Sequence, residues 1–215
     1  MFLLVLCFSS DSCEFSLDPN SAHRILKLSE DKRTVTRGTE EQQCPGHQDR
    51  FTDQPQVLSS TGLRGRCYWE VDWTRRRRWG GVIEIAVSHR GIRRRGTRES
   101  GFGTNDQSWS LTVCRGYYCL YHNNRQTAFS YFSSLSSSPY CPSFYPSSGR
   151  VSVFLDSEAG SLSFYEVVSD GELFHLHTFT SSFSEPVFPG FGLESEGSSV
   201  SVVDLRRAPP AGLRS

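Results

Sequence analysis

Alternation of apolar and polar residues with a period of two constrains the fold of this chain more than any other feature. Successive side chains of a β-strand point to opposite faces, so this pattern predicts strands with one buried face. No comparable stretch shows the helical period of 3.6. The alternation occurs in segments 67–71, 82–88, 108–113, 117–123, 150–156, 161–168, 173–179 and 199–205, which are separated by Gly, Pro, Asn and Asp. The sequence therefore predicts an all-β antiparallel sandwich.

The alternation also predicts which side chains enter the core. Val151, Val153 and Leu155 occupy every second position of one segment and should share the buried face. Trp69 alternates with polar or amphipathic neighbours and should point inward as well. These four residues give a direct test of the predicted facing of two strands.

The stretch "DSEAG" at 156–160 separates two of the predicted strands. Glycine adopts positive φ angles without a steric penalty, and aspartate often accepts a hydrogen bond from the backbone of its own turn. We therefore expect a positive φ at Gly160 and a turn capped by the carboxylate of Asp156.

Length and charge bound the domain count and exclude one class of function. The 215 residues, 36% of them hydrophobic, suffice for one sizeable core. Lys plus Arg equals Asp plus Glu at 23 each, so the chain has no global basic field for gathering nucleic acid. The charge is uneven, however: residues 64–98 hold eleven arginines against three acidic side chains.

Four consecutive arginines, Arg75–Arg78, lie between Trp73 and Trp79 in a connection between two predicted strands. Such a turn cannot bury four guanidinium groups, so we expect all four to project into water. Three interpretations remain open: a solvated loop, a partner-binding patch with Trp79 as an anchor, or a nuclear-localisation or nucleic-acid contact. A second run, Arg93–Arg95, gives the same choice between a solvated turn and a partner contact.

The segment from Phe129 to Gly149 holds nine serines and three prolines, which predicts a loop. Its aromatic side chains either pin the loop to the sandwich or are displayed to a partner. These aromatic residues are Tyr131, Phe132, Tyr140, Phe144 and Tyr145.

The seven cysteines form an odd set without a C-x-x-C pair, which predicts isolated and mostly buried thiols. Cys44 and His47 have a ligand-like spacing, but no second half-site follows, so no metal is expected. The absence of an N-x-S/T sequon adds to the case for a cytoplasmic protein.

Residues 1–12 form an apolar leader of uncertain nature, too short to span a bilayer and without a basic start. A truncated leader and a secretion signal both fit, so secretion is the alternative to a cytoplasmic location. Residues 206–215 are expected to form a flexible tail.

No catalytic constellation stands out. The six histidines are scattered, no G-x-S-x-G motif is present, and the Gly-rich stretches at 101–106 and 190–195 lack a strand-to-helix setting. His175 and His177 share a strand face, where edge packing is favoured over a metal pair. The sequence predicts a non-enzymatic protein with no cofactor and no metal.

Eight motifs in order resemble the PRY-SPRY (B30.2) domain, most of all the versions at the ends of fish NOD-like receptors, tripartite-motif ubiquitin ligases and stonustoxin-like proteins. The motifs are "SLDPNSAH", "LSEDKRTVTR", "RFTDQPQVLSSTGLRGRCYWEVDW", "IAVSHRGIRRRG", "GFGTNDQSWSL", "FLDSEAGSLSFYEV", "LHTFTSSFSEPVFPGF" and "SSVSVVDL". The resemblance implies a curved antiparallel sandwich over residues 13–205, with a PRY segment at about 13–63 and a SPRY segment at about 64–205.

The resemblance further implies a module that binds a protein or peptide through loops at one end of the sandwich, in innate immune sensing or ubiquitin-ligase targeting and within a larger multidomain parent. The alternative is a receptor for a small phosphorylated ligand in a basic pocket, as in butyrophilin-like relatives. The arginine run replaces a short glycine-rich turn of such domains. The expected partner-binding residues are Arg75, Arg76, Arg77, Arg78, Trp79, Arg93, Arg94, Arg95, Tyr140, Phe144 and Tyr145.

Overall fold

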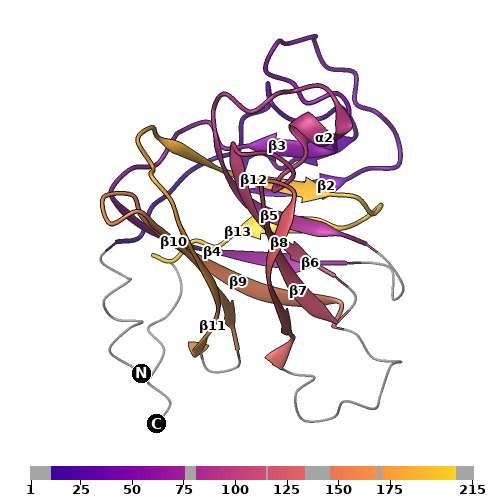
Figure 1. Cartoon of the computed structure of the whole chain (residues 1–215). Coiled ribbons are helices and arrows are strands. Elements are labelled where there is room, and N and C mark those ends of the chain that lie inside the picture. Colours follow the sequence, from indigo (N-terminus) through magenta and orange to yellow (C-terminus); the bar gives the residue numbers. More distant parts are fainter. Residues whose placement is uncertain (1–10, 76–80, 115, 134–145, 169–170, 207–215) are drawn as a thin grey trace.

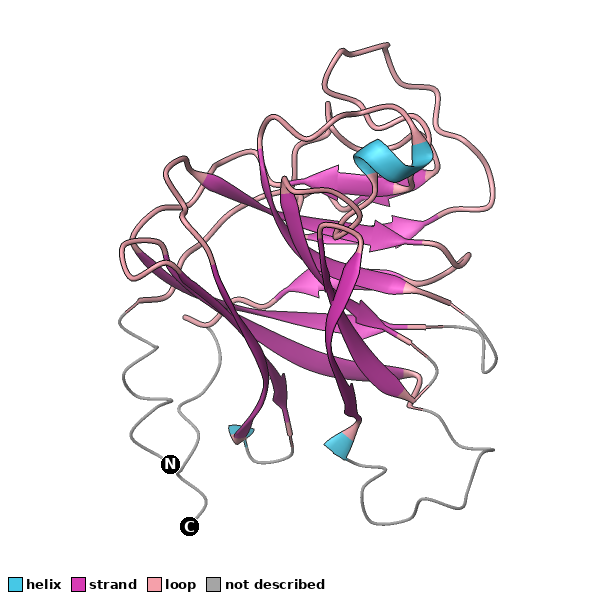
Figure 2. Ribbon diagram, viewed as in Figure 1, coloured by secondary structure: helices cyan, strands magenta, loops and turns pink. Residues whose placement is uncertain are grey.

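The computed structural model describes residues 11–75, 81–114, 116–133, 146–168 and 171–206 as two antiparallel β-sheets packed face to face (Figures 1 and 2). The seven-stranded sheet has the order β1-β2-β13-β4-β9-β10-β11, and the six-stranded sheet has the order β3-β12-β5-β6-β7-β8. The elements are β1 (Leu26–Leu28), β2 (Thr34–Arg37), β3 (Gln56–Leu58), β4 (Arg66–Thr74), β5 (Ile83–His89), α2 (Thr97–Ser100), β6 (Ser108–Val113), β7 (Tyr117–His122), β8 (Arg125–Tyr131), β9 (Ser148–Asp156), β10 (Ser161–Val167), β11 (Leu173–Thr180), β12 (Val187–Leu193) and β13 (Ser199–Val202).

All eight segments predicted from the period of two are strands, and the predicted sandwich is confirmed. They correspond to β4, β5, β6, β7, β9, β10, β11 and β13, although β13 ends three residues earlier than expected. Five strands were not predicted, namely β1, β2, β3, β8 and β12. Most of the missed strands have only three or four residues, which is too short for an alternation with a period of two to be recognised.

The core between the two sheets has the predicted facing. Val151, Val153 and Leu155 are fully buried, and Trp69 is 1% exposed. The Trp69 ring packs edge-on against Phe15, with ring centroids 5.9 Å apart. Burial of large apolar side chains on this scale is the main stabilising contribution to such a sandwich.

A second, smaller cluster lies on the outer side of the six-stranded sheet. It consists of Phe51, Leu58, Ala86, Ile92 and Phe102, with Phe188 packed against it. Its members come from β3, from β5 and from the connections on either side of these strands. The cluster therefore holds the long connections near residues 51, 92 and 102 against the sheet.

The predicted loop at Phe129–Gly149 is wrong at both of its ends. β8 continues to Tyr131 and β9 already begins at Ser148, while Tyr140, Phe144 and Tyr145 lie outside the described residues. Of the two aromatic residues described here, Phe132 is 1% exposed and packs into the sandwich as one interpretation expected, whereas Tyr131 is 64% exposed.

The edge strands β8 and β11 each contain a β-bulge. In β8 the bulge breaks the pairing with β7 between Leu120 and Tyr121, and in β11 it breaks the pairing with β10 between Phe164 and Tyr165. A bulge bends and twists its strand locally. Both edges are therefore irregular at their middles.

The prediction of isolated thiols is wrong for two cysteines, because Cys13 and Cys67 form a disulfide with their Cα atoms 5.3 Å apart. The partners are 54 residues apart in the sequence, and an odd total with no motif gave no basis for pairing them. Cys44, Cys114 and Cys119 are free thiols.

The turn between β9 and β10 has the expected geometry. Gly160 has φ of 69°, and the Asp156 carboxylate accepts a hydrogen bond from the Ala159 N–H at 2.9 Å. A Cβ atom at Gly160 would also lie 2.6 Å from the carbonyl oxygen of Ser181. Both expectations for this turn are confirmed.

We expect Gly160→Val to lower the free energy of unfolding by about 1–3 kcal/mol, because valine is strained at a positive φ. Asp156→Asn should change it little, since an amide oxygen can accept the same hydrogen bond. Urea unfolding of both variants measures the difference. Equal stability of Gly160→Val and the parent would contradict the strained-turn argument.

Candidate functional site

The connections between strands gather at two opposite ends of the sandwich. Residues 90–107 leave the sheet after β5, at the end where α2 lies, whereas Arg75 follows β4 at the opposite end, near the ends of β6 and β8 (Figure 1). The candidate residues Arg75 and Arg93–Arg95 therefore do not belong to one surface.

The prediction that Arg75 projects into water is wrong. Arg75 is 6% exposed, and its guanidinium donates hydrogen bonds to the carbonyl oxygens of Cys114 at 2.6 Å and Pro146 at 2.7 Å. The guanidinium carbon also lies 5.1 Å from the centre of the Trp73 ring. Burial lowers the pKa of Arg75 from its ordinary value.

The surroundings of Arg75 explain the failed prediction. The two carbonyl groups come from chain positions far from Arg75, and the backbone N–H of Arg75 donates to the carbonyl oxygen of Ser147 at 2.6 Å. Arg75 thus joins the end of β4 to the turn after β6 and to the entry of β9. Arg76–Arg78 and Trp79 lie outside the described residues.

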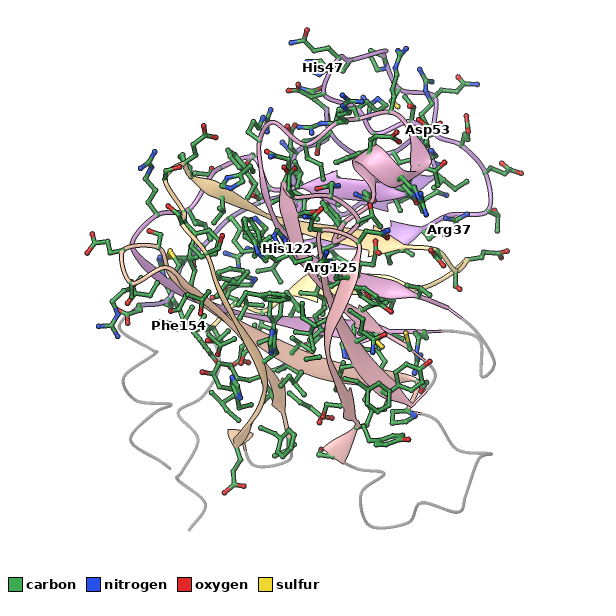
Figure 3. All side chains as sticks on the ribbon, viewed as in Figure 1. Arg37, His47, Asp53, His122, Arg125 and Phe154 are labelled. Carbon is green, nitrogen blue, oxygen red and sulfur yellow. A yellow bond between two sulfur atoms is a disulfide. The ribbon has the colours of Figure 1, made fainter. Side chains whose placement is uncertain are left out.

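At the opposite end, residues 38–55, between β2 and β3, and residues 90–107, between β5 and β6, form what we call the loop surface. Figure 3 shows Asp53 beside α2 at this end. Arg93 and Arg95 are exposed here, and none of the ion pairs of the described residues involves either of them. Two cationic side chains are thus presented to solvent.

Arg94, the middle residue of the same run, is half-buried and holds the two halves of the loop surface together. Its Nε donates to the carbonyl oxygen of Asp49 at 2.8 Å, and its Nη2 donates to that of Arg90 at 3.0 Å. The guanidinium carbon lies 4.9 Å from the centre of the Phe51 ring, a cation–π contact. Burial lowers the pKa of Arg94, as it does for a cation taken out of water.

Backbone and side-chain hydrogen bonds complete this junction. The Thr52 N–H donates to the carbonyl oxygen of Arg94 at 3.0 Å, and the Gly96 N–H donates to the Asp53 carboxylate at 2.9 Å. The Thr52 hydroxyl, followed by the Gly96 amide, lowers the pKa of Asp53. Nothing in the spacing of the sequence indicated that Thr52 and Asp53 would meet the second arginine run.

Arg90 also belongs to this region, but its charge is paired with two carboxylates. Its Nη2 lies 2.6 Å from the Asp49 carboxylate and 3.5 Å from that of Asp18. Its guanidinium carbon is 5.3 Å from the centre of the Phe188 ring. The exposed cations of the loop surface are therefore Arg93, Arg95 and Arg98, and its exposed carboxylates are Glu40, Glu41, Asp53, Glu99 and Asp106.

A hollow of about 290 Å³ lies between the end of β2 and the connection after β12. It is lined by Ile25, Arg37, Gly38, Thr39, Glu194, Ser195 and Glu196. The lining holds two carboxylates, Glu194 and Glu196, and one cation, Arg37. The Arg37 guanidinium already donates a hydrogen bond to the carbonyl oxygen of Leu193 at 3.0 Å. This hollow does not suit a phosphorylated ligand.

Glu84 on β5 lies opposite Gly192 of β12. Burial, with the negative charge of Glu194 as a second cause, raises the pKa of Glu84 to about 8. The folded protein therefore holds a proton on Glu84 at pH values at which the unfolded chain has released it.

Stability should therefore fall as the pH rises from the ordinary glutamate pKa towards about 8. Glu84→Gln imitates the protonated form, so we expect its melting temperature to match the parent at pH 5 and to exceed it by several degrees at pH 8.5. Thermal unfolding of both proteins across this range measures the effect. A constant difference at all pH values would show that Glu84 does not titrate as described.

The remaining titratable candidates have packing roles. The His175 Nε2 lies 2.8 Å from the Thr178 hydroxyl, and the His177 ring packs edge-on against Phe179 on the edge strand β11. The Asp49 N–H donates to the His47 Nδ1 at 3.2 Å. Within the described ranges no group of three or more His, Cys, Asp or Glu side chains is placed to hold a metal.

The family model of the SPRY-associated domain, PRY, matches residues 15–63, and that of the SPRY domain matches residues 66–206. The chain belongs to the PRY-SPRY family. The SPRY fold is a binding module. In the loop surface, connection 38–55 of the PRY match contacts connection 90–107 of the SPRY match.

The similar proteins are larger than this chain. Stonustoxin subunit beta of Synanceia horrida is 34% identical over 83% of the chain, and tripartite motif-containing protein 16 of Mus musculus is 33% identical over 95%. The chain spans 23% of the first and 34% of the second.

Solved structures agree with this fold. The crystal structure of the TRIM65 PSpry domain covers 94% of the chain with a TM-score of 0.76 and 24% identity. The stonustoxin structure covers 89% with a TM-score of 0.72 and 30% identity. No helix within the described ranges is long and apolar enough to cross a membrane.

Proposed function

We propose that the domain binds a protein or peptide partner through the loop surface, with Arg93 and Arg95 in contact with the partner. Arg94 and Asp53 act as positioning residues, because their hydrogen bonds join the two connections. The observation that carries the proposal is this network, which fixes the loops while leaving the two arginines exposed. A surface built before binding loses less conformational entropy when the partner arrives.

The exposed guanidinium groups of Arg93 and Arg95 suit carboxylates on the partner. Exposed guanidinium groups form paired hydrogen bonds with carboxylates and speed association with a negatively charged surface. We further propose that the module selects targets for a larger cytoplasmic protein in innate immune sensing or ubiquitin-ligase targeting. The similarity to tripartite motif-containing proteins supports this role.

Affinity capture from immune-stimulated cells, quantified by mass spectrometry, tests this surface. Arg93→Ser/Arg95→Ser should leave the melting temperature unchanged, because both side chains are exposed, and should reduce partner capture at least tenfold. The matched control Lys27→Ser/Arg64→Ser removes the same charge from exposed positions elsewhere. Equal capture by the two double variants would reject the loop surface as the contact site.

A second contact region remains proposed for residues that the structure does not describe. We propose that these residues contact the partner, as the sequence predicts; they are Arg76–Arg78, Trp79, Tyr140, Phe144 and Tyr145. Arg75, which directly precedes this arginine run, is held in place by its two hydrogen bonds to carbonyl oxygens, and this supports the proposal. Replacing Arg76–Arg78 with serine in the same capture experiment tests this region independently of the loop surface.

The second candidate function is binding of a small phosphorylated ligand, because exposed arginines such as Arg93 and Arg95 suit phosphate groups. Calorimetry with inorganic pyrophosphate distinguishes the two, because binding to a phosphate weakens steeply with added salt. Binding that disappears in Arg93→Ser/Arg95→Ser and falls with salt would support the phosphate receptor. No heat of binding at low salt would reject it and leave the protein partner.

A further inference from the structure

The disulfide joins the segment that leads into the PRY match to strand β4 of the SPRY match. Cys13 lies beside this strand, and its N–H donates to the carbonyl oxygen of Tyr68 at 3.0 Å. The Tyr68 N–H in turn donates to the carbonyl oxygen of Asp11 at 2.8 Å. The covalent bond between Cys13 and Cys67 is therefore flanked by two backbone hydrogen bonds.

Other non-covalent contacts hold the same segment. The Asp11 carboxylate forms an ion pair with Arg66 at 2.9 Å, and Phe15 packs edge-on against Trp69. These contacts do not depend on the sulfur–sulfur bond. Breaking the bond therefore leaves the segment attached at several points and does not require the sandwich to unfold.

The two sulfur atoms differ in their access to solvent. Cys67 is 3% exposed and belongs to the core, whereas Cys13 is only partly buried. A thiol reagent can therefore approach the bond from the Cys13 side, and access is one of the conditions for exchange. A thiol at Cys67 packs in the core as a small apolar side chain, so the reduced state has no buried charge.

The other described cysteines argue against a permanent framework of disulfides. Cys44, Cys114 and Cys119 are free thiols in the same chain. Among the described residues, one disulfide therefore stands beside three free thiols. Disulfides in reducing compartments are usually transient and catalytic or redox-sensing, and this arrangement fits that class.

We propose that Cys13 and Cys67 form a redox switch that is closed by glutathione disulfide and opened by glutathione. In closing, the Cys13 thiolate attacks one sulfur of glutathione disulfide, and the first glutathione leaves. The Cys67 thiolate then attacks the Cys13 sulfur of this mixed disulfide and expels the second glutathione. Two protein thiols are oxidised, one glutathione disulfide is reduced, and the two thiol protons pass to the two glutathione molecules.

The switch changes how firmly residues 11–15 are held on β4. In the closed state the disulfide fixes Cys13 beside Tyr68, so the flanking backbone hydrogen bonds rarely open. In the open state the ion pair and the aromatic contact hold the segment, so these hydrogen bonds open more often and their amides exchange faster. The change is local and does not involve the loop surface.

The experiment places the whole chain in glutathione buffers of increasing oxidised-to-reduced ratio, followed by alkylation and mass measurement. We expect Cys13 and Cys67 to change together between two thiols and one disulfide, with the same far-ultraviolet circular dichroism at both extremes. Hydrogen exchange at the amides of Cys13 and Tyr68 should be at least tenfold faster in the reduced form. Cys44→Ser, the control, should switch like the parent, and Cys13→Ser should exchange fast at every ratio.

Three results would overturn the proposal. A disulfide that fails to form in excess glutathione disulfide would show that the sulfur atoms do not pair. Reduction that proceeds only together with global unfolding would make the bond a permanent staple. Equal exchange rates in the oxidised and reduced forms would remove the conformational change.

Discussion

Trp69→Ala should lower the free energy of unfolding by about 3–5 kcal/mol, which is the usual cost of truncating a buried tryptophan. Trp69 is 1% exposed, lies in the central part of β4 and packs against Phe15. A loss of this size is a large share of the stability of a typical domain, so the variant should be largely unfolded at physiological temperature. Urea unfolding followed by circular dichroism measures the loss.

Two further variants sharpen this test. The indole N–H of Trp69 has no hydrogen-bond partner among the described residues, so Trp69→Phe should retain much of the stability lost by the alanine variant. Tyr131→Ala removes an aromatic ring that is 64% exposed and should change stability by at most about 0.5 kcal/mol. Similar losses for Trp69→Ala and Tyr131→Ala would contradict the burial argument.

Arg75→Ala should cost about 2–3 kcal/mol, because hydrogen bonds from a charged donor are among the stronger ones and two carbonyl groups lose theirs. These carbonyl groups belong to Cys114 and Pro146. The alanine also leaves an unfilled space beside Trp73. Thermal unfolding combined with hydrogen exchange near residues 114 and 146 measures both the global and the local effect.

Arg93→Ala is the matched control, since it removes an exposed arginine and should leave stability within about 0.5 kcal/mol of the parent. Arg75→Lys is informative as well, because one ammonium group cannot reproduce the planar fork that reaches two carbonyls. If Arg75→Ala were as stable as the parent, Arg75 would be solvated, as the sequence analysis predicts for the whole run of four arginines.

The strands found from the sequence are those with one buried face and enough length to show it. β4 and β9, with nine residues each, alternate regularly, and their inward residues form the centre of the core. β12 was missed because "VFPGFGL" contains a proline and two glycines, which normally end a strand. Gly190 is needed there, since a Cβ atom would lie 2.6 Å from the Phe102 ring. β8 was missed because it lies at a sheet edge, where most of its side chains are exposed and no alternation appears.

The candidate sites were harder to predict, because they depend on contacts between distant parts of the chain. The exposure of Arg93 and Arg95 agrees with a solvated or partner-contacting turn, but Arg94 between them is bound to Asp49, 45 residues away. Arg75 is buried by carbonyl groups whose positions follow from the whole topology. The pairing of Cys13 with Cys67 likewise depends on the parallel contact of the first described residues with β4.

The bulges in β8 and β11 bear on whether the edges of the two sheets can pair with a second copy of the domain. An edge strand with regular spacing offers its unpaired backbone groups to any other strand, and exposed aromatic residues such as Phe129, Tyr131 and Phe174 would add to the attraction. The extra residue in each strand interrupts the straight row of donors and acceptors that a second chain would need. Deleting Thr127, the residue skipped in the register of β8, would therefore straighten this edge and favour its pairing with a strand of a second chain.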